Sequence, residues 1–434
     1  MGLKISDEEY ASKIPVIHAP FTLNSFQFPR EQFEKAVSLA QLFNILVERI
    51  TRNPAWLIET LEPTAVSDLF IRQLLDIYQV VLKEGIRQPY SLAVNRSDYM
   101  LHSKEGDSRS LLQVELNTIA SSFGSLSTRI SEMHREISAM EEMDTQGSRS
   151  SGGSGSSVAE RNIPVNTALD EIAGGLAAAH NAYLSQTGLT NIGCSVVMIV
   201  QPGERNFADQ RLLQYQLFKN HRVRCFRATL AEVDQMGTLG SNNELIIDGK
   251  AVSVVYFRAG YSPDDHPTER EWSARLLIER SYAIKCPNIA VHLAGCKKVQ
   301  QVLADPGVLE MFIEESVQRE ALRSVFAGLY SLSDDTSTSI PAPTSASSDD
   351  KSQLSNKSQA LKDIKQKVEA DNGLNFVMKP QREGGGNNFY GPDVAEALRT
   401  MSLDEQVCHR QTDRQADKHI DSQTHTHTHM HKHT

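Results

Sequence analysis

Hydrophobic residues recur at helical spacing through the first third of the chain. Between residues 31 and 50 they fall every three or four positions, so they share one face of a helix. The stretch 66–85 repeats this pattern, with Ser67 as the expected N-cap and Gly85 just past the helix end. Both stretches are therefore predicted to be amphipathic helices that pack on a core.

The hydrophobic period changes to two at residues 111–117, which predicts a half-buried strand. Gln113, Glu115 and Asn117 share its polar face, and Leu112, Val114 and Leu116 share the other. Either a solvated sheet face or a ligand-binding face fits this alternation.

The middle of the chain combines continuous apolar runs with helical patterns, which is typical of an α/β domain. The expected strands lie at 194–202, 222–229 and 251–258, and the expected helices at 208–219 and 270–283. Polar tracts at 145–158 and 331–352 are predicted to be linkers.

Composition narrows the class of protein. A chain of 434 residues is expected to hold two or three domains, and its net charge of −10 argues against broad nucleic-acid binding. No apolar run reaches the roughly 18 residues that a membrane span needs, and no signal peptide opens the chain. The five cysteines form no CxxC pair, which fits a reducing compartment. We therefore expect a cytoplasmic protein without a membrane partner.

The stretch "MKPQREGGGNNFYG" (378–391) places three glycines after an expected strand that ends near Lys379. Backbone N–H groups without side chains can approach a phosphate closely, and the lysine adds positive charge. Glu383 would then lie beside the phosphates, where a divalent cation would offset its charge. The sequence indicates a nucleotide-triphosphate loop, with a flexible hairpin as the alternative.

Oxygen-bearing side chains suggest a metal site. Magnesium takes one or two protein carboxylates or amides together with phosphates, so Glu115, Asn117 and Glu383 would form a magnesium–phosphate site if the fold unites them. Three arginines stand where a loop could use them: Arg96 in "VNRSDYM", Arg205 just beyond an expected strand and Arg258 at the end of another. A guanidinium at such a place can bind a carboxylate. Ordinary surface arginines are the alternative.

Seven ordered motifs resemble those of eukaryotic glutathione synthetases. They are "NRSDYM", "VELNTIASSFG", "ERNFADQR", "VVYFRAGY", "LAGCKKVQQ", "GLYSL" and "KPQREGGGNNFYG". The resemblance covers roughly residues 20–391 and implies an α/β fold, an ATP-grasp ligase with an inserted three-layer α/β substrate-binding domain. It implies an N-terminal part of the ATP-grasp lobe at 1–193, the substrate domain at 194–296 and an incomplete ATP-binding part at 297–402. Residues 403–434 lie beyond the resemblance and, without apolar periodicity, are expected to form a disordered tail. The resemblance also implies a homodimer.

The resemblance implies roles for individual residues. Arg258, Lys379 and Glu383 would be catalytic, and magnesium would bind Glu115, Asn117 and Glu383. The γ-glutamylcysteine pocket would comprise Arg96, Ile119, Ala120, Ser121, Ser122, Glu204, Arg205, Asn206, Gln210, Arg258, Ala259, Gly260 and Tyr261. ATP would contact Glu115, Lys297, Lys379, Pro380, Gln381, Arg382, Glu383, Gly384, Gly385, Gly386, Asn387, Asn388 and Tyr390.

The implied activity is that of an ATP- and magnesium-dependent ligase, which joins γ-glutamylcysteine to glycine through an acyl phosphate. The alternative is a non-catalytic partial fold that binds ligand or pairs with a full-length subunit. The chain departs from the family pattern at Ala120 and Ala259, and the resemblance implies truncation at both ends. We accordingly expect impaired activity, and a strand at 375–380 that lacks sheet partners.

The final residues alternate histidine and threonine. Seven of the fourteen histidines lie there: His409, His419, His425, His427, His429, His431 and His433. A CA dinucleotide repeat would encode this alternation, so the tail is interpreted as translated non-coding sequence without a fold. Metal binding by clustered imidazoles is the alternative.

Overall fold

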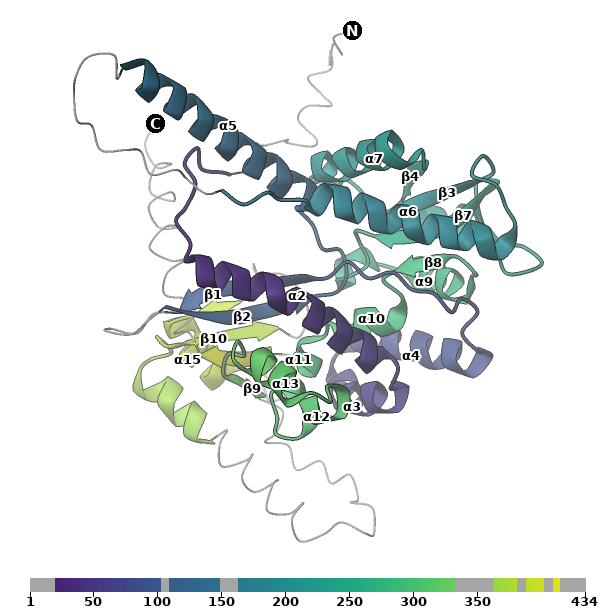
Figure 1. Cartoon of the computed structure of the whole chain (residues 1–434). Helices are drawn as coiled ribbons and strands as arrows, with labels where there is room; N and C mark the ends of the chain where they lie inside the picture. Colours follow the sequence, from purple (N-terminus) through teal and green to yellow (C-terminus); the bar gives the residue numbers. More distant parts are fainter. Residues whose placement is uncertain are drawn as a thin grey trace, which may run out of the picture.

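The computed structural model describes residues 20–102, 109–148, 163–331, 362–380, 388–401 and 409–413. Three sheets lie among helices (Figure 1). Most of the glycine-rich loop and most of the histidine-rich tail lie outside the described residues, as do the predictions that concern them.

The first helices follow the hydrophobic pattern closely. Helix α2 (Arg30–Thr51) confirms the prediction for 31–50, and α4 (Leu69–Glu84) corresponds to the helix predicted at 66–85. Between them lies α3 (Pro54–Ser67), which the pattern did not predict. The expected N-cap at Ser67 is wrong: Asp68 caps α4, because its carboxylate accepts from the backbone N–H groups of Phe70 and Ile71. Gly85 ends α4 with a φ of +85°, as expected for a residue past a helix end.

The apolar faces of α2, α3 and α4 share a core with short helices from later in the chain. These are α10 (Ile289–Ala294), α11 (Lys297–Leu303), α12 (Val308–Phe312) and α13 (Ser316–Arg323). The arrangement fixes α11 beside the first sheet, in which β1 (Arg96–His102) runs antiparallel to β2 (Ser110–Asn117). Arg96 is paired with Asn117 and Asp98 with Glu115, so polar residues of both strands lie side by side.

The second sheet has the order β4-β3-β7-β6-β5, with β8 paired to β7. Strands β3, β4, β7 and β8 are parallel, and β5 and β6 are antiparallel. Their bounds are β3 (Cys194–Ile199), β4 (Cys225–Ala228), β5 (Gly237–Leu239), β6 (Leu245–Ile247), β7 (Lys250–Phe257) and β8 (Ile284–Cys286).

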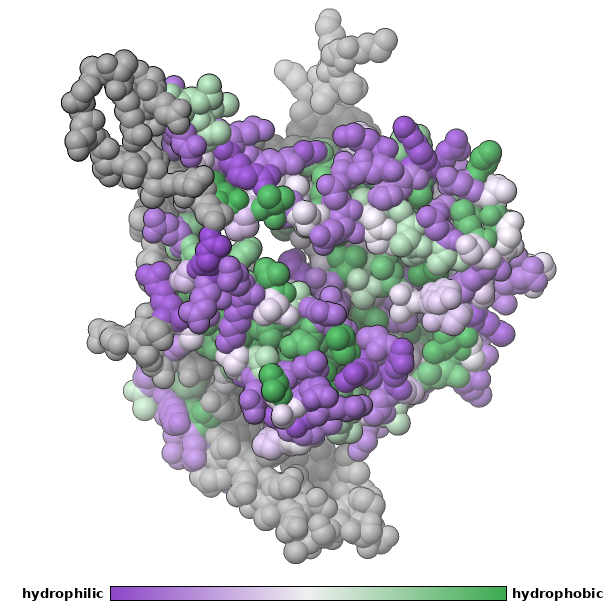
Figure 2. Space-filling view, viewed as in Figure 1, coloured by the Kyte–Doolittle hydropathy of each residue, from purple (hydrophilic) through white to green (hydrophobic). Residues whose placement is uncertain are grey.

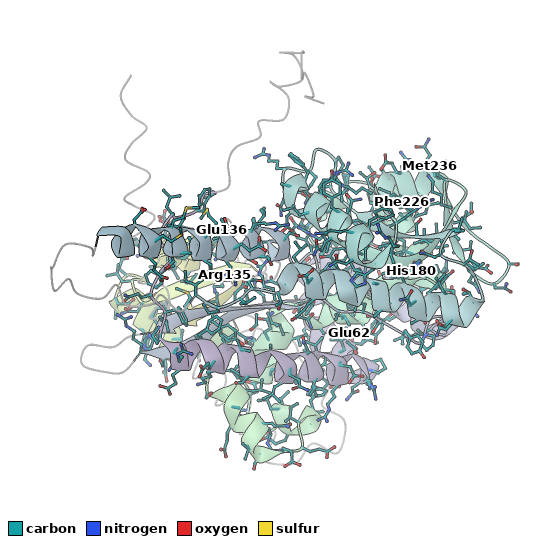
Figure 3. All side chains as sticks on the ribbon, turned by 45° about the horizontal axis from the view of Figure 1, so that its top comes forward. Glu62, Arg135, Glu136, His180, Phe226 and Met236 are labelled. Carbon is teal, nitrogen blue, oxygen red and sulfur yellow. The ribbon has the colours of Figure 1, made fainter. Side chains whose placement is uncertain are left out.

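Helices cover both faces of this sheet. One face packs on α6 (Ala168–Thr187) and α7 (Phe207–His221), and the other on α8 (Leu230–Met236) and α9 (Glu269–Arg280). Helix α6, which packs on this sheet, therefore lies before Cys194, the residue at which the substrate domain was expected to begin. Figure 3 shows His180 of α6 and Phe226 of β4 within this part of the molecule. Three layers of this kind agree with the expected α/β substrate-domain architecture.

The third sheet has the order β11-β10-β12-β9, formed by β9 (Leu329–Ser331), β10 (Phe376–Pro380), β11 (Phe389–Tyr390) and β12 (His409–Asp413). Helix α15 (Pro392–Thr400) packs against β10 and β11. The expectation that the strand at 375–380 lacks partners is wrong, because β10 is paired on both sides. One partner is β12, so these five tail residues also differ from the expectation of a tail without a fold.

Helix α5 (Gly124–Ser148) packs against α6 and α7 and extends beyond them (Figure 1). Hydrophilic residues occupy much of the face shown in Figure 2. In the part of the chain that the structure describes, no helix is both long enough and apolar enough to cross a membrane.

Candidate functional site

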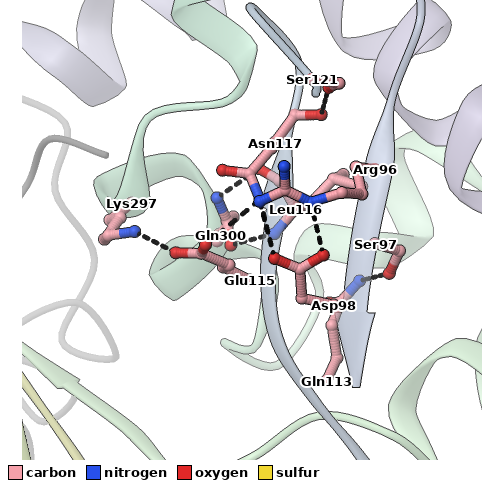
Figure 4. Close-up of polar contacts among 10 residues, drawn as sticks. All are labelled: Arg96, Ser97, Asp98, Gln113, Glu115, Leu116, Asn117, Ser121, Lys297 and Gln300. Carbon is pink, nitrogen blue, oxygen red and sulfur yellow. Dashed lines mark hydrogen bonds and ion pairs between the residues drawn. The ribbon is translucent and has the colours of Figure 1, made fainter. Parts of the chain in front are cut away.

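An ion pair joins β2 to the start of α11. The Lys297 ammonium donates to Glu115 Oε2 at 2.6 Å (Figure 4). The lysine side chain is 4% exposed and the glutamate side chain 20% exposed, so the pair is shielded from water but open on the carboxylate side. The polar face of the predicted strand therefore faces a cation from a distant part of the chain.

Charges around Glu115 keep it ionised. Burial raises the pKa of this carboxyl, but the Lys297 charge and hydrogen bond, the Asn117 hydrogen bond and the Lys379 charge together lower its pKa to about 2. Lys379 belongs to β10 and is 3% exposed. The fold thus brings together two lysines and one glutamate that are far apart in the sequence.

Asp98 extends this group on the neighbouring strand. Arg96 donates to both of its carboxylate oxygens, at 2.8 and 3.0 Å (Figure 4). The Asn117 amide bridges the two acids, donating to Asp98 Oδ2 and to Glu115 Oε1 at 3.1 Å each. Asp98 was not among the residues predicted from sequence. Asp98 could have been found from its position two residues after Arg96, because alternate residues of a strand lie on the same face.

Gln300 fixes the distance between β2 and α11. Its side chain accepts from the Leu116 backbone N–H at 3.0 Å and donates to the Leu116 carbonyl at 3.0 Å. Next to it, Gly295 lies so close to Thr118 that a Cβ there would be 2.1 Å from the threonine Oγ1. Only glycine allows this approach, which sets Lys297 opposite Glu115.

Asp209 connects three of the expected substrate motifs. Its carboxylate accepts from the backbone N–H groups at the start of α5, namely those of Phe123, Ser125 and Leu126. It also accepts from Arg258 at 2.9 Å, and both side chains are almost fully buried, at 2% and 3% exposure. Arg258 is therefore anchored by a buried acid in addition to any ligand that it binds.

The loop after β3 contributes a second carboxylate. Glu204 accepts from the Asn206 backbone N–H at 2.7 Å and from the Gln210 side chain at 2.6 Å. Gln210 is fully buried, whereas Arg205 is exposed. The structure therefore directs Glu204 and Gln210 inward, toward the carboxyl ends of the parallel strands, and leaves Arg205 at the surface.

Two tight loops border this region. Asp265 Oδ2 accepts from the backbone N–H groups of Gly260, Tyr261 and Ser262, which holds the loop after β7. Gly260 has a φ of +91°. In the loop after β2, Ile119 and Ser121 are buried, while Ala120 and Ser122 are partly buried and Ala120 has a φ of +51°.

The remaining expected ATP residues are only partly described. Pro380 ends β10, Asn388 donates to the Tyr390 hydroxyl at 3.0 Å, and Tyr390 is 38% exposed. Gln381, Arg382, Glu383, Gly384, Gly385, Gly386 and Asn387 lie outside the described residues. Whether Glu383 joins Glu115 and Asn117 thus stays a prediction.

The described residues contain no group of three or more His, Cys, Asp or Glu side chains that could hold a metal ion. Magnesium nevertheless prefers hard oxygen ligands, and three side chains here carry them: the ionised Glu115, the Asn117 amide and the adjacent Asp98. Two lysines beside them suit phosphate, and the guanidinium groups of Arg205 and Arg258, which follow β3 and β7, suit carboxylates.

Comparison with known proteins gives a family match over most of the chain. Residues 1–412 match the family described as "Eukaryotic glutathione synthase, ATP binding domain". The chain is 41% identical to the glutathione synthetase of Dictyostelium discoideum over 412 residues, which are 93% of this chain and 77% of the relative. It is 37% identical to the Homo sapiens glutathione synthetase over 409 residues, 93% of this chain and 76% of the relative.

A third relative and a solved structure are also similar to this chain. The chain is 40% identical to the chloroplastic glutathione synthetase of Arabidopsis thaliana over 402 residues, covering 92% of this chain and 66% of the relative. A solved structure of a glutathione synthetase-like effector from Globodera pallida, in its apoform, superposes with a TM-score of 0.61 at 21% identity. It covers 90% of this chain and 72% of the other, and it supports the fold alone.

Proposed function

Because the chain belongs to the eukaryotic glutathione synthetase family, we propose that it ligates γ-glutamylcysteine to glycine with hydrolysis of ATP to ADP and phosphate. The observation that carries the proposal is the convergence of Lys297 and Lys379 on Glu115. This group has the charges that a nucleotide triphosphate needs, and it lies at the end of the strand that leads into the expected peptide pocket.

The proposed ATP site is formed by the two lysines and the glycine-rich loop. Lys297 and Lys379 are buried ammonium groups, so their attraction for phosphate is weakly screened by water. Glu115 keeps Lys297 in place until phosphate arrives. In this proposal, Lys379 and Glu383 act on the transferred phosphoryl group, and residues 380–388 with Tyr390 surround the rest of the nucleotide.

Glu115 and Asn117, with Glu383, would hold magnesium. Their oxygens fit the ion, and Asp98 provides a further carboxylate beside them. When bound, the ion would offset the negative charge of the phosphates. Glu115 is suited to this role because its pKa of about 2 keeps it ionised at neutral pH.

Arg258, Glu204 and Gln210 are proposed to bind the peptide substrate, with Arg96 near its other end. Asp209 orients Arg258, so the guanidinium loses little side-chain freedom on binding a carboxylate. The loops 119–122 and 259–261 would border the peptide. Asp209 fixes the backbone directly after the first loop, at Phe123, and Asp265 holds the second.

The proposed reaction has two steps. First, a carboxylate oxygen of the glycine-accepting cysteine residue attacks the γ-phosphorus of ATP, the bond to the bridging oxygen breaks and ADP leaves. Next, the amine of glycine attacks the acyl carbon, loses a proton, and phosphate leaves with the oxygen of the former carboxylate. The chain's own contribution is to position the reactants and to exclude water from the acyl phosphate.

We further propose a cytoplasmic homodimer. Cys194, Cys225, Cys286 and Cys296 are free thiols, which fits a reducing compartment. Four large apolar side chains close together in the sequence are 41–70% exposed: Phe21, Leu23, Phe26 and Phe28. Clustered exposed apolar residues are typical of a protein–protein interface. Light scattering of the purified chain gives the mass directly, and a monomer at micromolar concentration would contradict the dimer.

The function is tested by following ADP release from the purified chain with γ-glutamylcysteine, glycine, ATP and magnesium. Release of ADP that requires both γ-glutamylcysteine and glycine, with an equal amount of glutathione formed, is the expected result. A matched control is Lys297→Ala, which should abolish this release because it removes a phosphate-binding charge. ATP hydrolysis that ignores glycine, or no reaction at all, would contradict the proposal for this chain.

A further inference from the structure

Arg227 lies at the edge of the second sheet where the proposed peptide site is formed. It is the penultimate residue of β4, and β3, β4 and β7 are parallel, so their carboxyl ends share one edge. Glu204 follows β3 and Arg258 follows β7 at this same edge. Ligands of α/β sheets bind at such edges. Arg227 belongs to none of the motifs considered above.

Helix α7 covers the side of the sheet on which Arg227 lies. Arg227 is in register with Met198, and Met198 packs in the core cluster that contains Leu213 and Leu217 of α7. The helix is attached to β4 directly, since the Gln214 side chain donates to the Cys225 carbonyl at 2.8 Å. Arg227 thus lies beneath a covering helix that holds its surroundings in place.

Two polar atoms in this region lack hydrogen-bond partners among the described residues. One is Arg227 Nε, a donor, and the other is Gln210 Oε1, an acceptor; both atoms are shielded from solvent. Gln210 is 0% exposed, and its amide nitrogen is already bound to Glu204. Buried polar atoms are seldom left unpaired, so one unpaired donor and one unpaired acceptor indicate a ligand that offers the complementary groups.

The charges favour an anion at Arg227. Burial lowers the pKa of Arg227, and the Arg211 charge lowers it further; Glu204 opposes these effects and Arg258 adds to them. Three guanidinium groups therefore act on the same region. The nearby Asp209 is already occupied by three backbone N–H groups and Arg258, which leaves Glu204 as the acid that offsets Arg227.

We propose that Arg227 binds the α-carboxylate of the γ-glutamyl residue and so selects substrates with a free α-amino acid end. The ammonium of that end lies on the side of Glu204 and Gln210 Oε1, which supply a negative charge and an acceptor. An α-amino acid group offers an acceptor and a donor together, as the two unpaired atoms require. This inference rests on the proposed function, because it names the part of the peptide that the site recognises.

The test compares Arg227→Gln with Arg224→Gln, in which the same change is made at an exposed arginine of the same segment. Arg227→Gln should raise the KM for γ-glutamylcysteine about tenfold or more and leave the KM for ATP unchanged, since a charge-assisted bidentate contact has about that value. Arg224→Gln should change neither. Arg227→Lys, which keeps the charge, should recover part of the loss.

Substrate analogues identify the group that Arg227 contacts. The wild-type chain should discriminate against 4-aminobutanoyl-cysteine, which lacks the α-carboxylate, and against glutaryl-cysteine, which lacks the α-amine. Arg227→Gln should no longer discriminate against 4-aminobutanoyl-cysteine but should still discriminate against glutaryl-cysteine. If the variant still rejects 4-aminobutanoyl-cysteine as strongly as the wild type does, Arg227 does not bind that carboxylate.

Calorimetry separates this inference from the proposed function. If the wild-type chain forms no glutathione but binds γ-glutamylcysteine, and Arg227→Gln weakens that binding about tenfold at an unchanged melting temperature, the inference stands and the function fails. If the chain forms glutathione and Arg227→Gln leaves KM, binding and analogue selectivity unchanged, the inference fails alone. A melting temperature that falls for Arg227→Gln but not for Arg227→Lys, with equal KM values, would make the residue structural and overturn the inference.

Discussion

Single contacts at the residue scale decide how the phosphate site is formed. Glu115 was predicted from the polar face of the strand at 111–117, and Lys297 from the family resemblance. Asp98, Gln300 and Asp209 were not, since their roles depend on partners from other elements. A strand pattern shows which residues share a face, but it does not show what approaches that face.

Replacing Glu115 tests the ion pair. Glu115→Gln leaves the buried Lys297 charge without its partner, so the free energy of unfolding at pH 7 should fall by about 2–3 kcal/mol. The folded pKa of Glu115 is lowered from 4.5 to about 2, so this stability is present above pH 4.5 and lost as pH falls toward 2. Urea unfolding of both proteins across this range gives the difference.

An exposed glutamate provides the control for that measurement. Glu48→Gln on α2, where the side chain is 50% exposed, should change stability little at any pH. A Glu115→Gln effect that stays constant between pH 5 and pH 2 would mean that the carboxylate charge is not its cause.

Gly295 tests the close approach of α11 to β2. Its backbone has ordinary helical angles, so alanine is excluded only by Thr118, whose Oγ1 would lie 2.1 Å from the new Cβ. Gly295→Ala should lower the free energy of unfolding by about 1–3 kcal/mol and raise the KM for ATP, because α11 carries Lys297. Thr118→Ala in the same chain should recover part of both losses.

The comparison for this change is Gly174→Ala. Gly174 lies within α6 with no atom near the position of a Cβ, so alanine there should raise the free energy of unfolding by about 0.5–1 kcal/mol. If Gly295→Ala is as well tolerated as Gly174→Ala, the packing of α11 on β2 is not as tight as described.

Elements with a strong hydrophobic period were predictable, and those without one were not. Helix α2, strand β2 and the later elements β3, α7, β4, β7 and α9 follow from the pattern, whereas the short elements α8, β5 and β6 were not predicted. Helix α3 was missed because proline occurs at both position 54 and position 63 within it. Strand β12 is wholly polar, so no sequence period could indicate it; its two strand neighbours impose the conformation.

Proline within β12 tests the third sheet. Gln411 is paired with Met378 of β10 and with Tyr330 of β9, so proline there removes a ladder hydrogen bond. Gln411→Pro should increase hydrogen exchange in residues 376–379, while strands β3 and β7 keep their protection. Gln411→Ala, which keeps the backbone N–H, should leave the exchange unchanged. Equal exchange in the proline variant would show that β12 does not pair with β10.

At the scale of the whole molecule, the proposed site lies where separate sheets meet. Glu115 comes from the first sheet and Lys379 from the third, while Arg258 and Glu204 flank strands of the second. Figure 1 shows β1, β2 and β10 near one another, with the second sheet above them. The relative placement of the sheets could not be read from local periodicity, because it depends on contacts between distant segments, such as those of α11 with β2 of the first sheet and β9 of the third.

The central claim is that this site transfers a phosphoryl group from ATP to a peptide carboxylate and then replaces it with glycine. It is tested most directly by γ-glutamylcysteine labelled with ¹⁸O in the carboxylate of its cysteine residue, with the phosphate product analysed by mass spectrometry. We predict one ¹⁸O atom in each phosphate released with glutathione, because the carboxylate oxygen leaves with phosphorus. Unlabelled phosphate, formed together with glutathione or without it, would contradict the account.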